Sequence, residues 1–139
     1  MPDETRPHIH VACAIIERGG LVLVAQRSET MTLPLKWEFP GGKIRQDESP
    51  EGCIVREIHE EMGVKAIITS QLNPSTHSYS FFTVTLYPFI CSLNNEEPRL
   101  LEHAALQWLP LDKLHTVDWA EADLPVLASY CRHRHETWD

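Results

Sequence analysis

A short helix with recognisable ends constrains the fold of this 139-residue chain more than any other feature of its sequence. Ser49 suits the N-cap position, Pro50 the first helical position and Gly63 the C-terminal cap, so the sequence predicts a helix over residues 50–62. A stripe of apolar side chains along one face of this helix has to pack against a sheet, which the rest of the chain must supply. The stripe consists of Ile54, Ile58 and Met62, with Val55 alongside.

Strands are predicted on both sides of this helix from runs of β-branched, apolar and aromatic residues. Residues 28–40 show no clean period and predict a loop, whereas residues 122–135 predict a closing amphipathic helix. The order of strands, helix, strands and helix predicts one layered α/β (α+β) domain over residues 1–139. The predicted strands cover residues 8–17, 21–25, 65–70, 80–92 and 104–109, and the first two form a hairpin.

Charge and composition narrow the classes of partner. The formal net charge of −8 opposes binding to a nucleic acid polymer, while a small phosphorylated ligand is compatible through a bound divalent cation. The first ten residues lack an apolar signal core and no apolar run reaches membrane-spanning length. We therefore expect a cytoplasmic protein with no membrane partner, as a monomer or homodimer. The four widely separated cysteines are expected to be buried thiols of a reducing compartment: Cys13, Cys53, Cys91 and Cys131.

Three glutamates occupy another face of the predicted helix, rotated away from the apolar stripe. Glu57, Glu60 and Glu61 are spaced i, i+3 and i+4, and like charges at that spacing repel one another. A cation would compensate them, and Mg²⁺ is the natural candidate because it prefers hard oxygen ligands. A plain solvated acidic face is the alternative interpretation of the triplet alone.

Residues 42–64 (GKIRQDESPEGCIVREIHEEMGV) resemble the Nudix box at every defined position. The resemblance continues through the WEFPGGK lead-in and covers nearly the whole chain. It implies a Nudix α/β/α sandwich with a mixed sheet between the helices, in the MutT-like branch of oxidised-guanine nucleotide diphosphatases and CTP pyrophosphohydrolases. The matching positions are Gly42, Glu48, Arg56, Glu57, Ile58, Glu60, Glu61, Gly63 and Val64.

The resemblance also implies roles for individual residues. It places a Mg²⁺ site, with Mn²⁺ as an alternative metal, at Glu57, Glu60, Glu61 and the backbone carbonyl of Gly41, with Glu57 and Glu60 also catalytic. Glu102 matches a glutamate that relatives carry on a mobile loop as an additional ligand or general base, although an exposed loop glutamate is often inert. Four residues complete the motif in structural roles: Gly42, Glu48, Arg56 and Gly63. Of these, Glu48 and Arg56 form a pair that fixes the loop against the helix.

Four further positions resemble substrate contacts of the family. Arg27 would meet phosphate or sugar, with a solvated strand-end arginine as the alternative. Lys43 would meet phosphate, with a surface charge as the alternative. Phe39 would line the base pocket, or it is plain core. Asp123, in an Asp-x-Pro sequence, resembles the cytidine triphosphate group more than the oxidised-guanine specialists, which carry asparagine there. An ionised carboxylate only accepts hydrogen bonds and so suits base edges that donate, while a simple helix cap is the alternative for Asp123.

The residues and the resemblance together predict the reaction. We expect Mg²⁺-dependent hydrolysis of a nucleoside triphosphate to a nucleoside monophosphate and pyrophosphate. Cytidine-type or modified pyrimidine nucleotides come first as substrates, and 8-oxo-guanine nucleotides second. The alternatives are hydrolysis of another nucleoside diphosphate-linked compound, such as a nucleotide sugar or dinucleotide, a non-catalytic ligand-sensing module, and a structural acidic-helix domain without metal.

Overall fold

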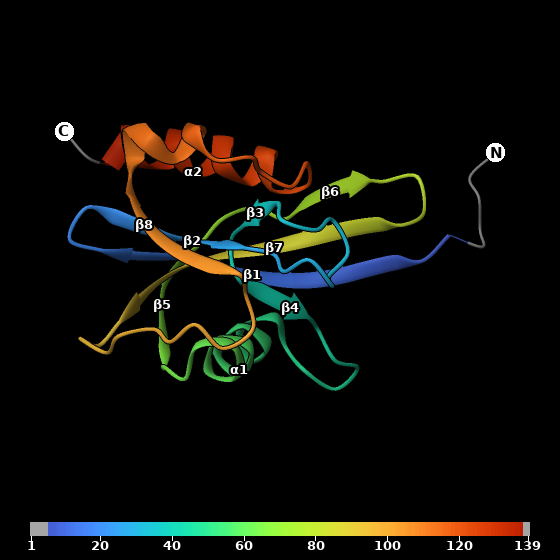
Figure 1. Ribbon diagram of the computed structural model, residues 1–139, viewed down its shortest axis with the longest axis horizontal. Helices are drawn as coiled ribbons and strands as arrows, with labels where there is room; N and C mark the ends of the chain where they lie inside the picture. The colour runs from blue at the N-terminus through green and yellow to red at the C-terminus, as the bar shows by residue number, and fades with distance from the viewer. Residues whose placement is uncertain (1–5, 138–139) are drawn as a thin grey trace.

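The computed structural model describes residues 6–137 as an eight-stranded sheet with one long helix on each face, as Figure 1 shows. The prediction about the first ten residues therefore falls partly outside the described residues. In chain order the elements are β1 (His8–Arg18), β2 (Leu21–Gln26), β3 (Trp37–Glu38), β4 (Gly41–Lys43), α1 (Pro50–Met62), β5 (Ala66–Gln71), β6 (Ser75–Ser78), β7 (Thr83–Leu93), β8 (Ala105–Pro110), the 3₁₀ helix η1 (Leu111–Thr116) and α2 (Asp123–Thr137).

The sheet is mixed, as predicted. Its central pair, β1 and β7, is parallel and runs from His8 opposite Thr83 to Ile16 opposite Cys91. The other strand pairs are antiparallel, and the predicted hairpin forms between β1 and β2. Along the main path the strand order is β3-β2-β1-β7-β5, while β4 pairs with β1, β6 with β7 and β8 with β2. The strand β1 therefore connects both halves of the sheet.

Alternate residues of β1 belong to two different cores. Ala12, Ala14 and Ile16 pack with the apolar stripe of α1 on one face of the sheet. Cys13 and Ile15 pack on the other face, which α2 covers. Because successive side chains of a strand point to opposite faces, a continuously apolar strand is what a sheet covered on both sides requires.

The helix α1 has the predicted ends. The hydroxyl of Ser49 accepts a hydrogen bond from the amide of Gly52 at 3.0 Å, and Pro50 is the first helical residue. Gly63 adopts the left-handed conformation with φ of 69° and donates from its amide to the carbonyl of His59. These caps fix where α1 begins and ends, and so they fix the register of its glutamates.

Four elements were not predicted from the sequence, and one strand begins later than predicted. The segment predicted as a loop over residues 28–40 contains β3, and β4 follows it directly. Both strands are very short and β4 has the sequence Gly-Gly-Lys, so they exist through their pairing with β2 and β1 and not through β propensity. The polar strand β6 and the helix η1 were not predicted either, and β7 begins at Thr83.

The cysteines are free, and three of them are buried as predicted. Cys131, in the second half of α2, is only partly buried and lines a depression together with Leu111 and His135. For that cysteine the prediction of a buried thiol is wrong. None of the helices in the described part of the chain is long and apolar enough to cross a membrane.

Candidate active site

The three glutamates of α1 lie in different environments although they share one face of the helix. The side chain of Glu60 is 45% exposed, that of Glu57 16% and that of Glu61 only 5%. Glu57 packs directly on β4, where a Cβ added to Gly42 would lie 2.3 Å from the Glu57 carboxyl carbon. Only glycine at position 42 therefore lets α1 approach β4 so closely.

An ion-pair network built on Arg56 holds the middle of α1 to the preceding loop. Arg56 Nε lies 2.6 Å from Glu48 Oε2, and Arg56 Nη1 lies 2.7 Å from Glu57 Oε1 and 3.1 Å from Glu60 Oε2. Glu48 also accepts from the amide of Arg45. The hydrogen bond from Arg56 is the main reason why the pKa of Glu48 is lowered to about 2. Arg56 therefore holds three carboxylates in place at once.

Glu61 is a buried carboxyl group in an acidic surrounding. Its Oε2 has no hydrogen-bond partner among residues 6–137, and His103 Nδ1 approaches it at 3.9 Å. Burial, followed by the charges of Glu38, Glu57 and Glu102, raises the pKa of Glu61 to about 10. A buried, unpaired carboxyl oxygen is unfavourable, so this site gains free energy from any cation that reaches it.

The loop between β7 and β8 is attached to the rest of the site at several points. The amide of Arg99 donates to the carbonyl of Met62 at 2.9 Å, and the Arg99 guanidinium lies where a Cβ on Gly63 would otherwise project. At the other end of the loop, His103 Nε2 bonds Glu38 Oε2 at 2.9 Å. Glu102 is exposed between these attachments, and its charge contributes to the raised pKa of Glu61.

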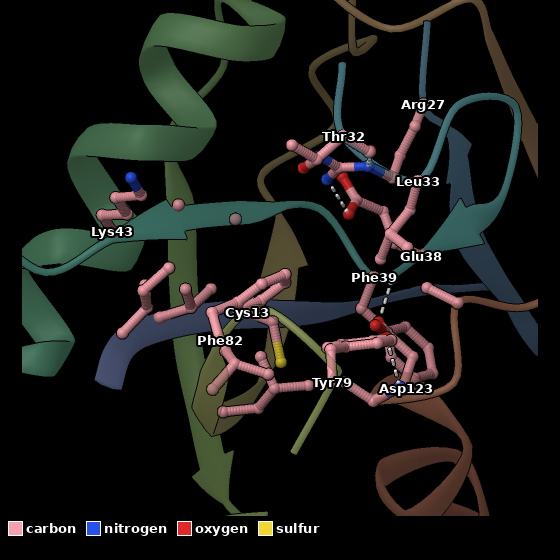
Figure 2. Close-up of a pocket in the computed structure, with 18 of the residues that line it drawn as sticks. Cys13, Arg27, Thr32, Leu33, Glu38, Phe39, Lys43, Tyr79, Phe82 and Asp123 are labelled. Atoms are coloured by element: carbon pink, nitrogen blue, oxygen red, sulfur yellow. Dashed lines mark hydrogen bonds and ion pairs between the residues drawn. The ribbon is translucent and has the colours of Figure 1, made fainter. Parts of the chain in front are cut away.

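A cavity of about 430 Å³ opens beside this cluster. Its walls contain all four residues predicted to contact substrate, and Figure 2 shows Asp123 and Lys43 at opposite ends of it. Gly41 and Gly42 also line the cavity, so it reaches β4, the strand against which Glu57 of α1 packs. The apolar part of the wall comes mainly from β1, the β6–β7 hairpin and β7: Ile9, Val11, Tyr79, Phe82, Val84 and Leu86.

Arg27 follows β2 and holds the loop beside the cavity. Its Nε donates to the carbonyl of Thr32 at 2.5 Å and its Nη2 to the Thr32 hydroxyl at 2.9 Å. Its Nη1 pairs with Glu38 Oε1 at 2.7 Å. These contacts use three of the five N–H groups of a guanidinium, so much of the donor capacity of Arg27 serves the protein itself.

Asp123 is buried at the first position of α2, at one end of the cavity. Its Oδ2 accepts a hydrogen bond from the amide of Phe39 at 2.9 Å, so its side chain joins α2 to the segment between β3 and β4. Burial, and then the charge of Glu38, raises the pKa of Asp123 well above its usual range. Phe39 is buried too, with its ring 4.8 Å from that of Trp119. Phe39 is thus both a core residue and part of the cavity wall.

Two residues of this site were missed in the sequence. Glu38 contacts Arg27 on one side and His103 on the other, and both contacts depend on the tertiary fold. The position of Glu38 next to the Gly41-Gly42 motif is the one local signal that could have drawn attention to it. His103 has no such signal, because one histidine after Glu102 looks like any loop residue.

No three His, Cys, Asp or Glu side chains of residues 6–137 form a ready-made metal cluster. The carboxylates of Glu57 and Glu60 are turned toward Arg56. A metal site on this helix therefore requires these side chains to exchange Arg56 for a cation, or to share it with one.

Comparisons with known proteins agree with this architecture. A family model described as NUDIX domain matches residues 6–130. The chain is 37% identical over 125 residues, 89% of this chain and 88% of the relative, to a Mycobacterium tuberculosis (strain ATCC 25618 / H37Rv) protein provisionally named 8-oxo-dGTP diphosphatase 2. It is 33% identical over 122 residues, 88% of this chain and 90% of the relative, to the CTP pyrophosphohydrolase of Escherichia coli K12.

A solved structure shows the same relationship. The DNA mismatch repair protein MutT of methicillin-resistant Staphylococcus aureus 252, described as a Nudix hydrolase, superposes with a TM-score of 0.75 at 40% identity. The match covers 92% of this chain and 98% of that one. The predicted family and sandwich fold are confirmed. The family model and these relatives show that the chain belongs to the Nudix family and is a MutT-like hydrolase.

Proposed function

We propose that this hydrolase converts a nucleoside triphosphate to a nucleoside monophosphate and pyrophosphate with the help of Mg²⁺. The observation that carries the proposal is the continuity of the cavity. One end holds a buried polar group, Asp123, while the other is lined by Gly41 and Gly42 next to the glutamate face of α1. A nucleoside in the apolar part would direct its phosphates toward the carboxylates.

The residues present suit a magnesium ion. Mg²⁺ takes oxygen ligands, and α1 offers Glu57, Glu60 and Glu61 within two turns, with the carbonyl of Gly41 on the neighbouring strand. The uncompensated Oε2 of Glu61, which lacks a hydrogen-bond partner in the described part of the chain, favours a cation at this place. When bound there, Mg²⁺ would neutralise phosphate charge and lower the pKa of water.

The remaining residues would bind and position the substrate. Lys43, exposed at the α1 end of the cavity, would pair with phosphate oxygens. Glu102, whose charge contributes to the raised pKa of Glu61, would accept a proton as a general base or add a ligand. The substrate is a small nucleotide, the protein acts as a monomer or homodimer, and its free thiols fit a cytoplasmic location.

Cytidine-type nucleotides are our first choice of substrate. The support is the similarity to the CTP pyrophosphohydrolase of E. coli and the Asp-x-Pro sequence at Asp123. An 8-oxo-guanine nucleotide is the second candidate, because the raised pKa of Asp123 changes what this side chain offers. A protonated carboxyl group donates as well as accepts, so it also pairs with the acceptor O6 of guanine-type bases.

A panel of nucleotides tests the proposal. Purified protein is incubated with CTP, dCTP, modified pyrimidine triphosphates, 8-oxo-dGTP, a nucleotide sugar and a dinucleotide, with and without Mg²⁺, and the products are separated. We expect a nucleoside monophosphate and pyrophosphate from a triphosphate, only with the metal. A product from the nucleotide sugar or dinucleotide alone would assign the other class of substrate, and no product from any compound would favour a ligand-sensing module.

Variants of α1 test the roles of its glutamates. Glu57→Gln and Glu60→Gln should each lower kcat by about 100-fold or more, because each removes a carboxylate that would hold the metal against the reacting phosphates. Glu51→Gln is the matched control, since Glu51 is exposed in the first turn of the same helix. If kcat in either of the first two variants equals that of Glu51→Gln, the proposed site is wrong.

A further inference from the structure

His103 lies between the cavity and the glutamate face of α1, yet it belongs to neither the motif nor the cavity wall. Its side chain is 3% exposed. One ring nitrogen, Nε2, is 2.9 Å from Glu38 Oε2, and the other, Nδ1, faces Glu61 Oε2 at 3.9 Å. The buried imidazole therefore links the carboxyl groups of Glu38 and Glu61, because neither group can move without changing its contact with the ring.

The connection continues into the cavity. Glu38 lines the cavity wall and bonds Arg27 through its Oε1 while it bonds His103 through its Oε2. Both oxygens of this carboxylate are therefore fixed, each by a different neighbour. The result is one continuous series of contacts from Arg27 through Glu38 and His103 to Glu61, which joins the substrate cavity to the buried glutamate of α1.

The same histidine fixes the loop that carries Glu102. Arg99 attaches the middle of this loop to the C-terminal end of α1, and the amide of Ala104 donates to the carbonyl of Gln26 at 2.9 Å. Between these two backbone attachments, the side chains of residues 100–102 are exposed and that of His103 is buried. Glu102, its neighbour in the chain, is thus held on the outside of the loop beside the cluster.

We propose that His103 is a positioning residue of the hydrolysis reaction: it holds Glu38 and the Glu102 loop in the arrangement in which Glu102 serves the glutamate face of α1. This inference rests on the function proposed above. A purely structural histidine would stabilise the fold and leave the turnover of folded protein unchanged. A positioning histidine affects kcat beyond any loss of folded protein, because a small displacement of a reacting group is costly.

Two substitutions of His103 separate the effect of its hydrogen bond to Glu38 from the effect of its bulk. His103→Gln keeps an N–H that can reach Glu38, while His103→Phe keeps a flat ring of similar bulk and removes the hydrogen bond. We expect His103→Phe to lower kcat by about 10- to 100-fold, with KM changed much less, and His103→Gln to retain most of the activity. His115→Phe, at an exposed histidine of η1, controls for the exchange of residue type.

A double-mutant cycle with Glu102→Gln tests the link to Glu102. If His103 acts by placing Glu102, the loss caused by Glu102→Gln should largely disappear in the His103→Phe background. Additive losses would overturn the proposal. Equal kcat values for folded His103→Phe and wild type would also overturn it, as would a loss in His103→Gln as large as that in His103→Phe.

A measurement without substrate keeps this inference separate from the choice of nucleotide. The rise in melting temperature that Mg²⁺ produces is recorded for wild type, His103→Phe and His103→Gln, each against Na⁺ at equal ionic strength. We expect a smaller rise in His103→Phe than in the other two proteins, because only His103→Phe loses the hydrogen bond to Glu38 that fixes the Glu102 loop beside the glutamate face. Failure of wild type to hydrolyse any nucleotide would contradict the proposed function, whereas identical Mg²⁺ responses in all three proteins would contradict the role of His103.

Discussion

At the scale of single residues, the site consists of ionisable groups in unequal surroundings. Glu48 is held ionised by Arg56, which lowers its pKa to about 2, whereas burial raises the pKa of Glu61 to about 10. Both belong to one short motif. The two carboxyl groups are chemically identical, yet they have different tasks. The ion pair with Arg56 makes Glu48 a structural residue, while burial makes Glu61 a group that favours a nearby cation.

Glu61→Gln should therefore leave the metal-free protein as stable as wild type or more stable. The amide has the shape of the protonated acid and replaces a carboxyl group whose ionisation is disfavoured by burial and by the charges of Glu38, Glu57 and Glu102. The same variant should lose most of the stabilisation that Mg²⁺ gives to wild type. Chemical unfolding in EDTA and in Mg²⁺ measures both effects, and an undiminished Mg²⁺ response would exclude Glu61 as a ligand.

Asp123 gives a pH dependence of stability. Because burial raises its pKa in the folded state, the folded protein binds its proton more tightly than the unfolded chain does. Its contribution to stability is therefore complete below the unfolded pKa of about 3.9 and is lost as pH rises toward the folded pKa, by at most about 1.4 kcal/mol per pH unit.

Asp123→Asn should consequently gain stability relative to wild type as pH rises from 5 to 8. The asparagine oxygen can still accept from the amide of Phe39, while its side chain does not titrate. Urea unfolding at the two pH values gives the difference, and an unchanged difference would contradict the assigned burial effect. The same variant, assayed on CTP and 8-oxo-dGTP, shows whether Asp123 reads the base: equal preference in both proteins would remove it from recognition.

At the scale of elements, α1 is defined by two glycines with different tasks. Gly42 on β4 makes room for the Glu57 carboxylate, and Gly63 ends the helix in a left-handed conformation beneath the Arg99 guanidinium. Position 63 therefore requires glycine for two reasons. Any other residue would be strained at this positive φ, and its side chain would displace the loop that carries Glu102.

Gly63→Ala should lower the free energy of unfolding by about 1–2 kcal/mol from the left-handed backbone alone, and it should lower kcat by displacing Arg99. Gly52→Ala is the matched control on the same helix, since its nearest non-neighbouring atom would be the Ser49 hydroxyl at 3.2 Å and its backbone is helical. Equal stability and kcat in the two variants would show that Arg99 and φ at Gly63 do not matter.

The elements that could be predicted are those whose causes are local. Ser49, Gly63 and the apolar stripe define α1 within fifteen residues of sequence, and the apolar run of β1 is equally local. The strands β3, β4 and β6 were not predicted, because their residues pair only where a partner strand is already present. The contact of His103 with Glu38 crosses 65 positions of the chain, and no local pattern signals it.

At the scale of the whole molecule, the site is assembled at the edge of two packed layers. The cavity opens on the face that α2 covers, and the glutamates project from the helix on the opposite face. The two meet at Gly41 and Gly42. The far end of α2 lies away from this junction and is held by Glu17, which accepts from the Tyr130 hydroxyl and pairs with Arg134.

Tyr130→Phe should consequently separate stability from function. Loss of the hydroxyl removes one hydrogen bond to a charged acceptor and should lower the free energy of unfolding by about 1–2 kcal/mol. The values of kcat and KM should stay close to those of wild type, because Tyr130 does not line the cavity and its hydroxyl donates to Glu17. Denaturant unfolding and steady-state kinetics on the same preparation test this, and a tenfold loss of kcat would show that α2 transmits its packing to the site.

The parallel pairing of β1 with β7 limits how early this enzyme can fold during its synthesis. His8 pairs with Thr83, so the central ladder closes a loop of about 75 residues, and the entropy lost in that closure is recovered only afterwards, through packing on both faces. A chain still emerging from the ribosome would hold the complete glutamate motif before it holds β7, the Glu102 loop or Asp123. We therefore expect nascent chains to be inactive toward nucleotides until the last helix has been synthesised.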